Sequence, residues 1–486
     1  MSKIITLASA ILVVFACNLQ IFTQSDRPRV EISVKDTTTI RVSIDFVGYG
    51  HEIKFVNEYA GIGGLSGRIS GLKTTDTQRK PMTYRSLADG TYVADRSIGA
   101  LSYDVDLKAA SDPASRVHVS WLDDDRGVLM LGDLLPQTEG PLAAWLQLNL
   151  PVGWMPSTAE RGIGSTLFDV LEPDKAIITI GKNLRQNDER LSDADIQYAT
   201  PDRWHFTDDE ASKMISAIAS YYSKILGPLK APRRKQVVLV KLRDQPPGTW
   251  KAETRGRNIL IASSDMPFRS QSLQRLHEQL RHELFHLWIP NGVNLSGNYD
   301  WFYEGFALYQ SLRLGVEANR IRFEDFLDTL SRASQLSAGT HRPISLIEAS
   351  RQRWAGNSSQ VYTRGMIVAF LCDLILLDES RGKSGVTEIL EEIYKRHGGG
   401  AARLNAETAI LSTLRAHERL RPVVDRYITG NETFVIGEYL KLAGLTLGSS
   451  HPAQISVEPK LAGRQKVVLD RLGYNSWRKL SDSKND

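Results

Sequence analysis

One short stretch limits how this chain can fold. Residues 282–286 read H-E-L-F-H, and residues four apart share one face of a helix, so His282 and His286 can direct two imidazole nitrogens at one ion with Glu283 beside them. Leucines recur around the stretch at spacings of three and four: Leu273, Leu276, Leu280, Leu284 and Leu287. The pattern predicts a helix that carries a metal site, preceded by a capping serine at Ser270 or Ser272.

The two histidines are too few ligands for a catalytic zinc ion. Zinc accepts nitrogen and carboxylate ligands in tetrahedral geometry, and a catalytic site has three protein ligands and one open position. Glu304, eighteen residues after His286, is the candidate third ligand. We expect it on a second helix from about Asp300 to Leu314, with Gly315 as the C-terminal stop. Turn-forming residues separate the two helices: Pro290, Gly292, Gly297 and Asn298.

The sequence after this stretch resembles a known family. H-E-x-x-H followed by W-F-Y-E-G-F-A at 301–307 resembles the gluzincin zinc metallopeptidases, which include membrane alanyl aminopeptidases and glycyl aminopeptidases. Four later features favour the glycyl branch: S-L-I-E-A-S at 345–350, Trp354, V-Y-T-R-G at 361–365 and E-Y-L-K-L-A-G-L at 438–445. The resemblance covers roughly residues 205–446. It implies a thermolysin-like zinc catalytic core that hydrolyses peptides.

The resemblance also implies a role for each residue of the candidate site. His282, His286 and Glu304 would hold one Zn²⁺ per chain, and Glu283 would be the general base that takes a proton from the attacking water. Tyr362, in V-Y-T-R-G, matches the tyrosine that donates to the carbonyl oxygen as that oxygen becomes negative. The alternative for Tyr362 is an aromatic residue that packs at the start of a helix.

The substrate-binding segment departs from the family pattern. Relatives hold the amino group of the substrate with a carboxylate in a G-G-L-E-H-like or G-x-M-E-N-like motif on an edge strand. Residues 248–255 read G-T-W-K-A-E-T-R here, without the paired glycines and the histidine. Glu253 is the candidate substrate-binding acid, and an exposed loop glutamate is the alternative. The connection between His286 and Glu304 is also shorter than in most glycyl aminopeptidases.

The amino terminus predicts export. Lys3 precedes an apolar stretch, 4–16, that is too short to span a bilayer, and we expect residues 1–24 to be a signal peptide. V-F-A-C at 14–17 resembles a lipobox, in which Cys17 would carry a lipid anchor. Ordinary cleavage near Gln24-Ser25 is an equal alternative, and an uncleaved anchor is a third. The expected location is therefore the periplasm or the cell surface, with any membrane attachment through this anchor alone.

Composition excludes some partners. The chain of 486 residues has a net charge of only +4, which gives no case for nucleic acid as a partner. Hydrophobic residues make up 42% and charged residues 24%, as in ordinary globular proteins.

The second of its two cysteines, Cys372, lies in the apolar run V-A-F-L-C-D-L-I-L-L and is predicted to be a core residue of a buried helix.

Periodicity divides the rest of the chain into four parts. Alternation at Val30, Ile32 and Val34 predicts an antiparallel β domain over 28–205, with further strands near 92–94, 101–106, 116–121, 127–131 and 175–180. His51 and His118 in this part, and His277 further on, are interpreted as structural. The catalytic core, 206–330, starts at a capping box, Thr207 to Glu210, and continues through strands 237–242 and 258–262.

A helical domain is expected over 331–446 and a tail over 447–486. The predicted helices span 323–335, 346–354, 360–378, 385–396, 405–416 and 418–429. The tail contains the strand-like segments I-S-V-E-P and Q-K-V-V-L-D and is too short for the PDZ domain of many glycyl aminopeptidases.

These observations predict an α+β multidomain protein. It has an N-terminal antiparallel β domain, a thermolysin-like zinc core and a C-terminal helical bundle. The expected function is an exported zinc aminopeptidase that acts on peptide substrates. An endopeptidase, or another amide hydrolase on the same core, is the first alternative. A peptidase-like binding protein without turnover is the second, and Glu283 counts against it because binding alone needs no general base.

Overall fold

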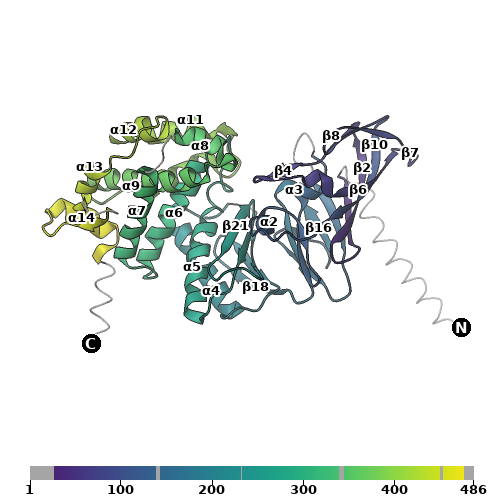
Figure 1. Ribbon diagram of the computed structural model, residues 1–486, viewed down its shortest axis with the longest axis horizontal. Helices are drawn as coiled ribbons and strands as arrows, with labels where there is room; N and C mark the ends of the chain where they lie inside the picture. Colours follow the sequence, from purple (N-terminus) through teal and green to yellow (C-terminus); the bar gives the residue numbers. More distant parts are fainter. Residues whose placement is uncertain (1–26, 138–142, 231, 339–343, 449–452, 476–486) are drawn as a thin grey trace, which may run out of the picture. The chain divides into compact units, whose positions relative to one another are not determined.

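The computed structural model describes residues 27–137, 143–230, 232–338, 344–448 and 453–475 (Figure 1). The predicted signal peptide and Cys17 lie outside these residues. The chain forms two compact units. Unit 1 contains the residues up to Ser111 and Val119–Lys182, and unit 2 contains Asp112–His118 and the residues from Asn183 onward. The second unit therefore begins before residue 205, where the sequence pattern suggested the end of the β domain.

Unit 1 is built from β-strands. Its largest sheet has the order β15-β16-β13-β1-β2-β10-β6-β7, and a second has the order β11-β12-β17-β14. Neighbours are antiparallel except β1 and β13, which run parallel. The strands are β1 (Arg29–Val34), β2 (Thr39–Tyr49), β3 (Glu52–Lys54), β4 (Glu58–Tyr59), β5 (Ile62–Gly63), β6 (Ile69–Asp76), β7 (Pro81–Met82), β8 (Tyr84–Ala88), β9 (Thr91–Ala94), β10 (Ile98–Asp106), β11 (Trp121–Leu122), β12 (Arg126–Met130), β13 (Ala144–Asn149), β14 (Met155–Thr158), β15 (Arg161–Gly162), β16 (Leu167–Val170) and β17 (Ile177–Gly181).

The core of unit 1 confirms the alternation seen in the sequence. Val30 and Ile32 of β1 are buried together with Val42 and Ile44 of β2, because every second side chain of a strand points to the same face. A one-turn helix, α3 (Leu131–Leu134), packs on the same core.

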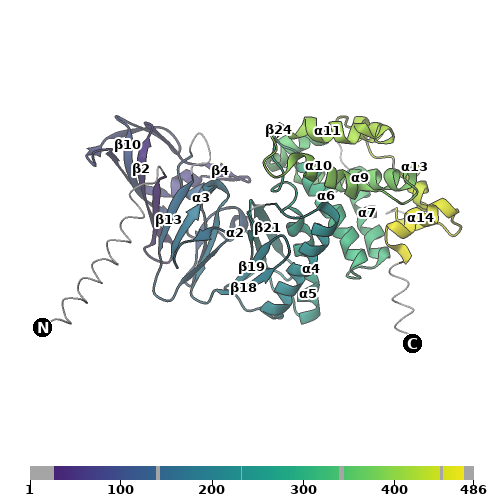
Figure 2. The same ribbon diagram turned by 180° about the vertical axis from the view of Figure 1, so that it is seen from behind.

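Unit 2 starts with a mixed five-stranded sheet of order β18-β19-β20-β22-β21. The strands β19, β20 and β22 are parallel, and β18 and β21 form antiparallel edges. Two helices, α4 and α5, cover one face of this sheet (Figures 1 and 2). The elements are β18 (Arg185–Arg190), β19 (Asp195–Thr200), α4 (Asp208–Leu226), β20 (Arg234–Lys241), β21 (Trp250–Arg255), β22 (Asn258–Ser263) and α5 (Arg269–Phe285).

The ends of these helices follow the sequence signals only in part. The predicted capping box is present at α4, where the Glu210 amide donates to Thr207 Oγ1 and Glu210 Oε2 accepts from the Thr207 amide. The predicted serine cap of α5 is wrong, because the N-cap is Phe268 and it makes no side-chain cap.

Two helices cross closely beside α5. A Cβ atom on Gly305 of α6 (Asp300–Glu317) would lie 2.3 Å from the carbonyl carbon of Gly365 in α9 (Ser358–Glu379). The two glycines therefore let the backbones of α6 and α9 touch. The predicted stop at Gly315 is wrong, because α6 continues through it to Glu317.

The remaining helices surround this pair (Figure 2). Q-K-V-V-L-D is helical, against the prediction, because Val468, Leu469 and Leu472 are buried at helical spacing. The predicted helix over 418–429 is broken into short turns, and the predicted strand over 116–121 is the short helix α2 (Ser115–His118) followed by β11. The other helices are α7 (Phe323–Ala338), α8 (Leu346–Arg351), α10 (Val386–His397), α11 (Ala406–Ala416), α12 (Arg421–Val423), α13 (Gly437–Leu440) and α14 (Gly463–Arg471). Short strand pairs are β23 (Leu295–Ser296) with β24 (Leu404–Asn405), and β25 (Leu445–Leu447) with β26 (Ile455–Val457).

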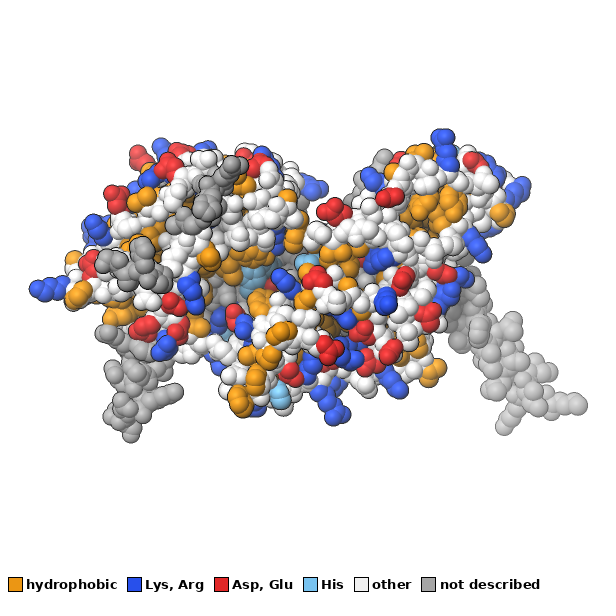
Figure 3. Space-filling view, viewed as in Figure 1, with side chains coloured by type: hydrophobic (Ala, Val, Ile, Leu, Met, Phe, Trp, Pro, Cys, Tyr) orange, Lys and Arg blue, Asp and Glu red, His pale blue; other side chains and the backbone are white. Residues whose placement is uncertain are grey.

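Helix α9 is the central helix of unit 2. It is the one helix of the described residues that is long and apolar enough to cross a membrane, but 83% of its apolar window is buried inside the protein. Cys372 on α9 is fully buried, as predicted, and burial raises the pKa of its thiol. In contrast to this apolar helix, the face of the molecule seen in Figure 3 carries intermixed acidic and basic side chains.

Candidate metal centre

Helices α5 and α6 bring three predicted ligands to one point. His282 Nε2 lies 3.2 Å from His286 Nε2 and 3.2 Å from Glu304 Oε2, and His286 Nε2 lies 3.4 Å from Glu304 Oε2. All three side chains are buried. Ligand atoms about 2.0–2.1 Å from a tetrahedral zinc ion lie roughly 3.3 Å from one another. The three atoms therefore have the spacing of one face of a zinc coordination sphere.

Hydrogen bonding places an acceptor of His286 beside the Glu304 carboxylate. His286 Nδ1 lies 3.0 Å from the carbonyl oxygen of Ile289, which can only accept, so Nδ1 carries the proton and Nε2 presents a lone pair. A carboxylate oxygen is likewise an acceptor. His286 Nε2 and Glu304 Oε2 are therefore two buried acceptors 3.4 Å apart, an arrangement that fits a zinc ion.

Glu283 lies beside the ligands and is held by the edge strand. Its Oε1 is 4.0 Å from His282 Nε2, and its Oε2 accepts a hydrogen bond of 2.8 Å from Thr254 Oγ1 of β21. The backbone carbonyl of Glu283 also lies 3.2 Å from the same hydroxyl. Thr254 therefore fixes the carboxylate while leaving Oε1 on the side of the metal ligands.

Tyr362 enters the site from α9. Its ring centroid is 6.4 Å from that of His282, and its hydroxyl oxygen accepts a hydrogen bond of 2.7 Å from Arg353 Nη2. Burial and the nearby Glu304 carboxylate raise the pKa of Tyr362 well above its usual value. The phenol therefore keeps its proton and remains a donor.

Arg353, which the sequence patterns did not single out, connects the ligands to their surroundings. Its Nη2 donates to Glu304 Oε1 at 2.9 Å, so the other oxygen of Glu304 turns toward the histidines. Its Nη1 donates to Asp300 Oδ1 at 2.6 Å. Burial opposes ionisation of Glu304, but the guanidinium of Arg353 holds the pKa of that carboxyl well below its usual range. The position of Arg353 next to Trp354, a residue of the family pattern, was the only sequence signal.

Glu253 is bound by two side chains on β21 and α2. Its Oε1 accepts from Arg255 Nε at 2.9 Å, and its Oε2 lies 2.6 Å from His118 Nδ1. Burial raises the pKa of Glu253, but Arg255 and His118 lower it more, to about 2. Side chains alternate along the strand, and Thr254, not Glu253, is the β21 residue that contacts Glu283.

A cavity of about 730 Å³ opens onto the centre. His282, Glu283 and Tyr362 line it, as do Trp250 and Ala252 of β21. Its volume is within the range of pockets that hold small molecules and short peptides. One ligand, His282, the acid Glu283 and the donor Tyr362 thus face one cavity.

Comparison with known proteins agrees with this geometry. No protein-family model matches the sequence, and no curated protein matches it. Among solved structures, an aminopeptidase N family protein from Idiomarina loihiensis superposes with a TM-score of 0.73 at 15% identity, over 87% of this chain and 79% of that one. An M1 zinc metallopeptidase from Deinococcus radiodurans superposes with a TM-score of 0.53 at 12% identity, over 84% of this chain and 93% of that one.

These likenesses show that the chain has the fold of the gluzincin aminopeptidases. The fold is a mixed α/β architecture with antiparallel sheets and a helical C-terminal region, as predicted. The thermolysin-like character of the core and the glycyl branch stay predictions.

Proposed function

We propose that this chain is an exported zinc metallopeptidase that removes N-terminal residues from peptides. The observation that carries the proposal is the set of three ligand atoms at the spacing of a zinc site, with Glu283 beside them in a peptide-sized cavity. The fold that the chain shares with zinc aminopeptidases supports it. Export is supported by the apolar stretch at 4–16.

Glu283 is the proposed general base. A zinc ion bound by His282, His286 and Glu304 would acidify a water molecule and polarise the scissile carbonyl group. Glu283 Oε1 is not bonded to Thr254, so this oxygen accepts the proton from water and passes it to the leaving amine. Thr254 keeps the carboxylate from rotating away during both proton transfers.

Tyr362 is the proposed donor to the carbonyl oxygen. Its hydroxyl oxygen accepts from Arg353, so its position is fixed, and the residue lines the cavity. A donor of this kind is worth about a hundredfold or more in rate, because the carbonyl oxygen becomes negative in the transition state.

A peptide mixture tests the proposed function. Half of the peptides would have free amino termini and half would be acetylated, and the purified zinc-loaded protein would be incubated with both halves. Products would be read by mass spectrometry. We expect ladders that lack N-terminal residues, from the free peptides only.

A Glu283→Gln variant is the matched control. It keeps the size and hydrogen bonding of the side chain but cannot take a proton, so it should bind zinc and lose nearly all turnover. Absence of cleavage by wild-type protein that holds one zinc ion would refute the peptidase proposal and favour the binding-protein alternative.

An endopeptidase is the second candidate, and one observation favours it. The Glu253 carboxylate is already bonded to Arg255 and His118, so its charge is balanced before any substrate ammonium group arrives. Internal cuts in both free and acetylated peptides would establish this alternative. If free termini are required instead, Glu253→Gln should raise KM more than it lowers kcat.

A further inference from the structure

The cavity at the metal centre contains a buried arginine without a counter-charge. Arg281 of α5 lines the cavity and is only 2% exposed. Its Nη1 lies 2.8 Å from His277 Nδ1, and its Nε donates to Ser311 Oγ at 3.3 Å. A guanidinium has no acceptor atom, so His277 accepts through Nδ1 and is the neutral tautomer. Both partners are therefore uncharged, and no carboxylate of the described residues forms an ion pair with Arg281.

The fold makes room for this guanidinium. A Cβ atom on Gly315 of α6 would lie 3.0 Å from Arg281 Cζ and 3.0 Å from Ile321 Cδ1. Leu308 and Leu312 of α6 also line the cavity. The cavity lining therefore includes apolar side chains, and the guanidinium lies where a side chain at position 315 would intrude.

Most of the other charged side chains that line the cavity have partners of opposite sign. Glu283 serves as the proposed base, and the remaining pairs among the described residues are Glu278 with Arg275, Asp325 with Arg322, Arg332 with Asp328, and Arg353 with Glu304. Glu278 acts on Arg281 electrostatically, but its carboxylate is bonded to Arg275 at 2.8 Å. Lys251, exposed on β21, is a second lining cation without an ion pair in the described part of the chain. The lining thus contains two cations without an ion pair, Arg281 and Lys251, and one carboxylate without a cationic side-chain partner closer than 4.0 Å, Glu283.

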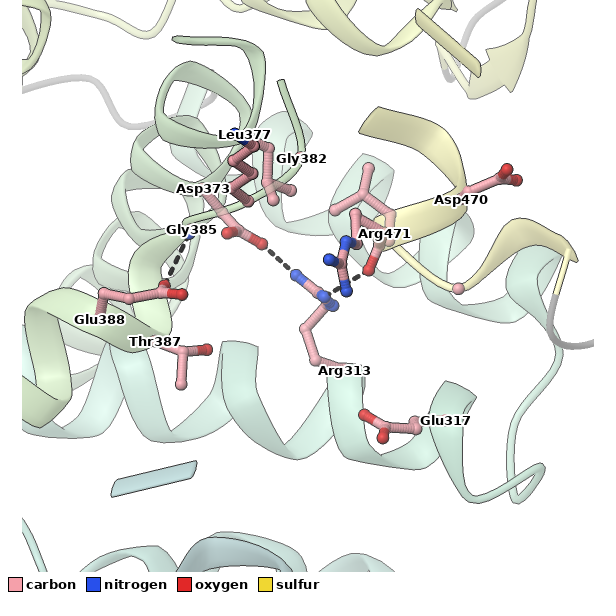
Figure 4. A pocket seen from close by; sticks show the side chains of 13 residues that line it. Arg313, Glu317, Asp373, Leu377, Gly382, Gly385, Thr387, Glu388, Asp470 and Arg471 are labelled. Atoms are coloured by element: carbon pink, nitrogen blue, oxygen red, sulfur yellow. Dashed lines mark hydrogen bonds and ion pairs between the residues drawn. The ribbon is translucent and has the colours of Figure 1, made fainter. Parts of the chain in front are cut away.

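A second cavity in unit 2 shows the opposite arrangement. It has a volume of about 350 Å³, and Figure 4 shows Arg313 directed at the Asp373 carboxylate inside it. Arg313 also donates to the backbone carbonyl of Arg471 at 2.6 Å. Its charge is balanced within the protein, so this cavity does not call for an anionic ligand.

A buried charge is costly unless a counter-charge and hydrogen bonds accompany it. A carboxylate on a ligand would supply both to Arg281, in the charge-assisted geometry that a guanidinium favours. We propose that the cavity selects peptides with an aspartate or glutamate side chain next to the scissile bond, and that Arg281 determines this specificity. The inference rests on the proposed function, since it assigns the substrate class of the same site.

Matched peptides test the inference. Zinc-loaded wild-type protein would be given peptide pairs that differ only by Glu or Gln at one position, on either side of the bond that is cut. We expect kcat/KM to be at least about tenfold higher for the Glu peptide at one of these positions, because the neutral isostere leaves the arginine unpaired. Equal cleavage of both members at every position would overturn the inference and leave the proposed function intact.

Variants assign the preference to Arg281. Arg281→Gln should reduce the Glu-over-Gln ratio to near one, whereas Arg281→Lys should keep part of it. Arg332→Gln is the matched control, because Arg332 lines the same cavity but is exposed and paired with Asp328 at 3.1 Å, so the ratio should stay near that of wild type. A ratio that survives in folded Arg281→Gln would refute the assignment. The ratio is an informative readout because loss of overall activity alone could reflect misfolding.

Binding separates the inference from the proposed function. The same peptide pairs would be titrated into zinc-loaded wild-type protein by calorimetry. Tighter binding of Glu peptides without any cleavage would support the inference and refute the peptidase proposal. Equal affinity of the Glu and Gln peptides, or binding of neither, would refute the inference.

Discussion

At the scale of single residues, Arg353 sets the orientation of the metal centre. One guanidinium bonds the carboxylate of Glu304, the hydroxyl of Tyr362 and the carboxylate of Asp300. It also stacks on Trp354, with its Cζ 4.6 Å from the ring centroid. A planar fork with fixed donor directions can join a ligand and a transition-state donor in this way, whereas the single ammonium of a lysine cannot.

Loss of Arg353 should weaken zinc binding. Arg353→Gln frees Glu304 to rotate, and loss of such an outer-sphere partner typically costs about 10–100-fold in metal affinity. Competition with a chromophoric chelator measures the zinc Kd. The control is Arg351→Gln, two residues earlier, whose side chain is exposed and pairs with Glu407. An unchanged Kd in folded Arg353→Gln would show that Glu304 does not depend on this contact.

His277 should make stability depend on pH. Burial, with the charges of Arg281 and Arg320 nearby, lowers the pKa of His277 to about 3 from the ordinary value of 6.5. Between these two values the unfolded chain binds a proton that the folded chain does not, so this residue costs stability as pH falls from about 6.5 toward 3.

The comparison variant is His277→Asn, which keeps a neutral acceptor but does not titrate. Urea unfolding midpoints would be measured at pH 7.5 and 5.0 in the presence of a chelator, so that metal release does not contribute. The midpoint of wild type should fall more than that of the variant. Parallel decreases in the two proteins would mean that His277 is not held neutral in the fold.

The ligands could be predicted from sequence, but their supports could not. His282, Glu283 and His286 follow from one helical turn, and Glu304 follows from a turn and a second helix, so local spacing was sufficient. Arg353 and Thr254 reach the site from a turn after α8 and from an edge strand, and no local pattern specifies such long-range contacts. The contact between His118 and Glu253, at 2.6 Å, could not be predicted for the same reason, because it joins residues far apart in the sequence.

At the scale of elements, the crossing of α6 and α9 determines how Glu304 and Tyr362 meet. Each residue lies within three positions of a glycine at the crossing, Gly305 or Gly365. The family pattern contains both glycines, and the structure gives the reason: a Cβ on Gly365 would lie 2.3 Å from the carbonyl oxygen of Trp301. Gly315 shows the limit of sequence reasoning, since a glycine that serves packing looks the same as one that ends a helix.

Gly365→Ala should separate the two helices. Overpacking of this kind costs about 1–3 kcal/mol, and the shift should also weaken zinc binding because Glu304 is carried on α6. Denaturant unfolding and the zinc Kd measure the two effects. Gly463→Ala at the start of α14 is the control, since its Cβ would meet open space and alanine favours helix. Wild-type stability in Gly365→Ala would show that the crossing relaxes freely.

At the scale of the whole molecule, the candidate site belongs to one of the two units. The described metal ligands, the proposed base and all residues that line the 730 Å³ cavity belong to unit 2, whereas unit 1 has a hydrophobic core of its own. Sequence periodicity could predict a β-rich part followed by a helical part. It could not place the boundary, because β18 and β19 have ordinary strand patterns. Only the pairing of β19 with β20, and of β18 with β19, assigns them to unit 2.

Removal of zinc should destabilise unit 2 selectively. A ligand that binds only the folded state stabilises it by mass action, and the three ligands lie in α5 and α6. Hydrogen exchange with and without chelator should show faster exchange in peptides from α5 and α6, with strands β1, β2 and β10 unchanged. Equal acceleration in both units would mean that they unfold as one.

The path of the chain between the units has a consequence for evolution. Residues 112–118 belong to unit 2, although the segments on both sides of them belong to unit 1. Recombination between two related genes at a single junction near residue 183 would separate His118 from Glu253, its partner at 2.6 Å. A hybrid that takes all of unit 2 from one parent must therefore also take residues 112–118, which the part of the gene before residue 183 encodes. We therefore expect the two parts of the gene to be inherited together.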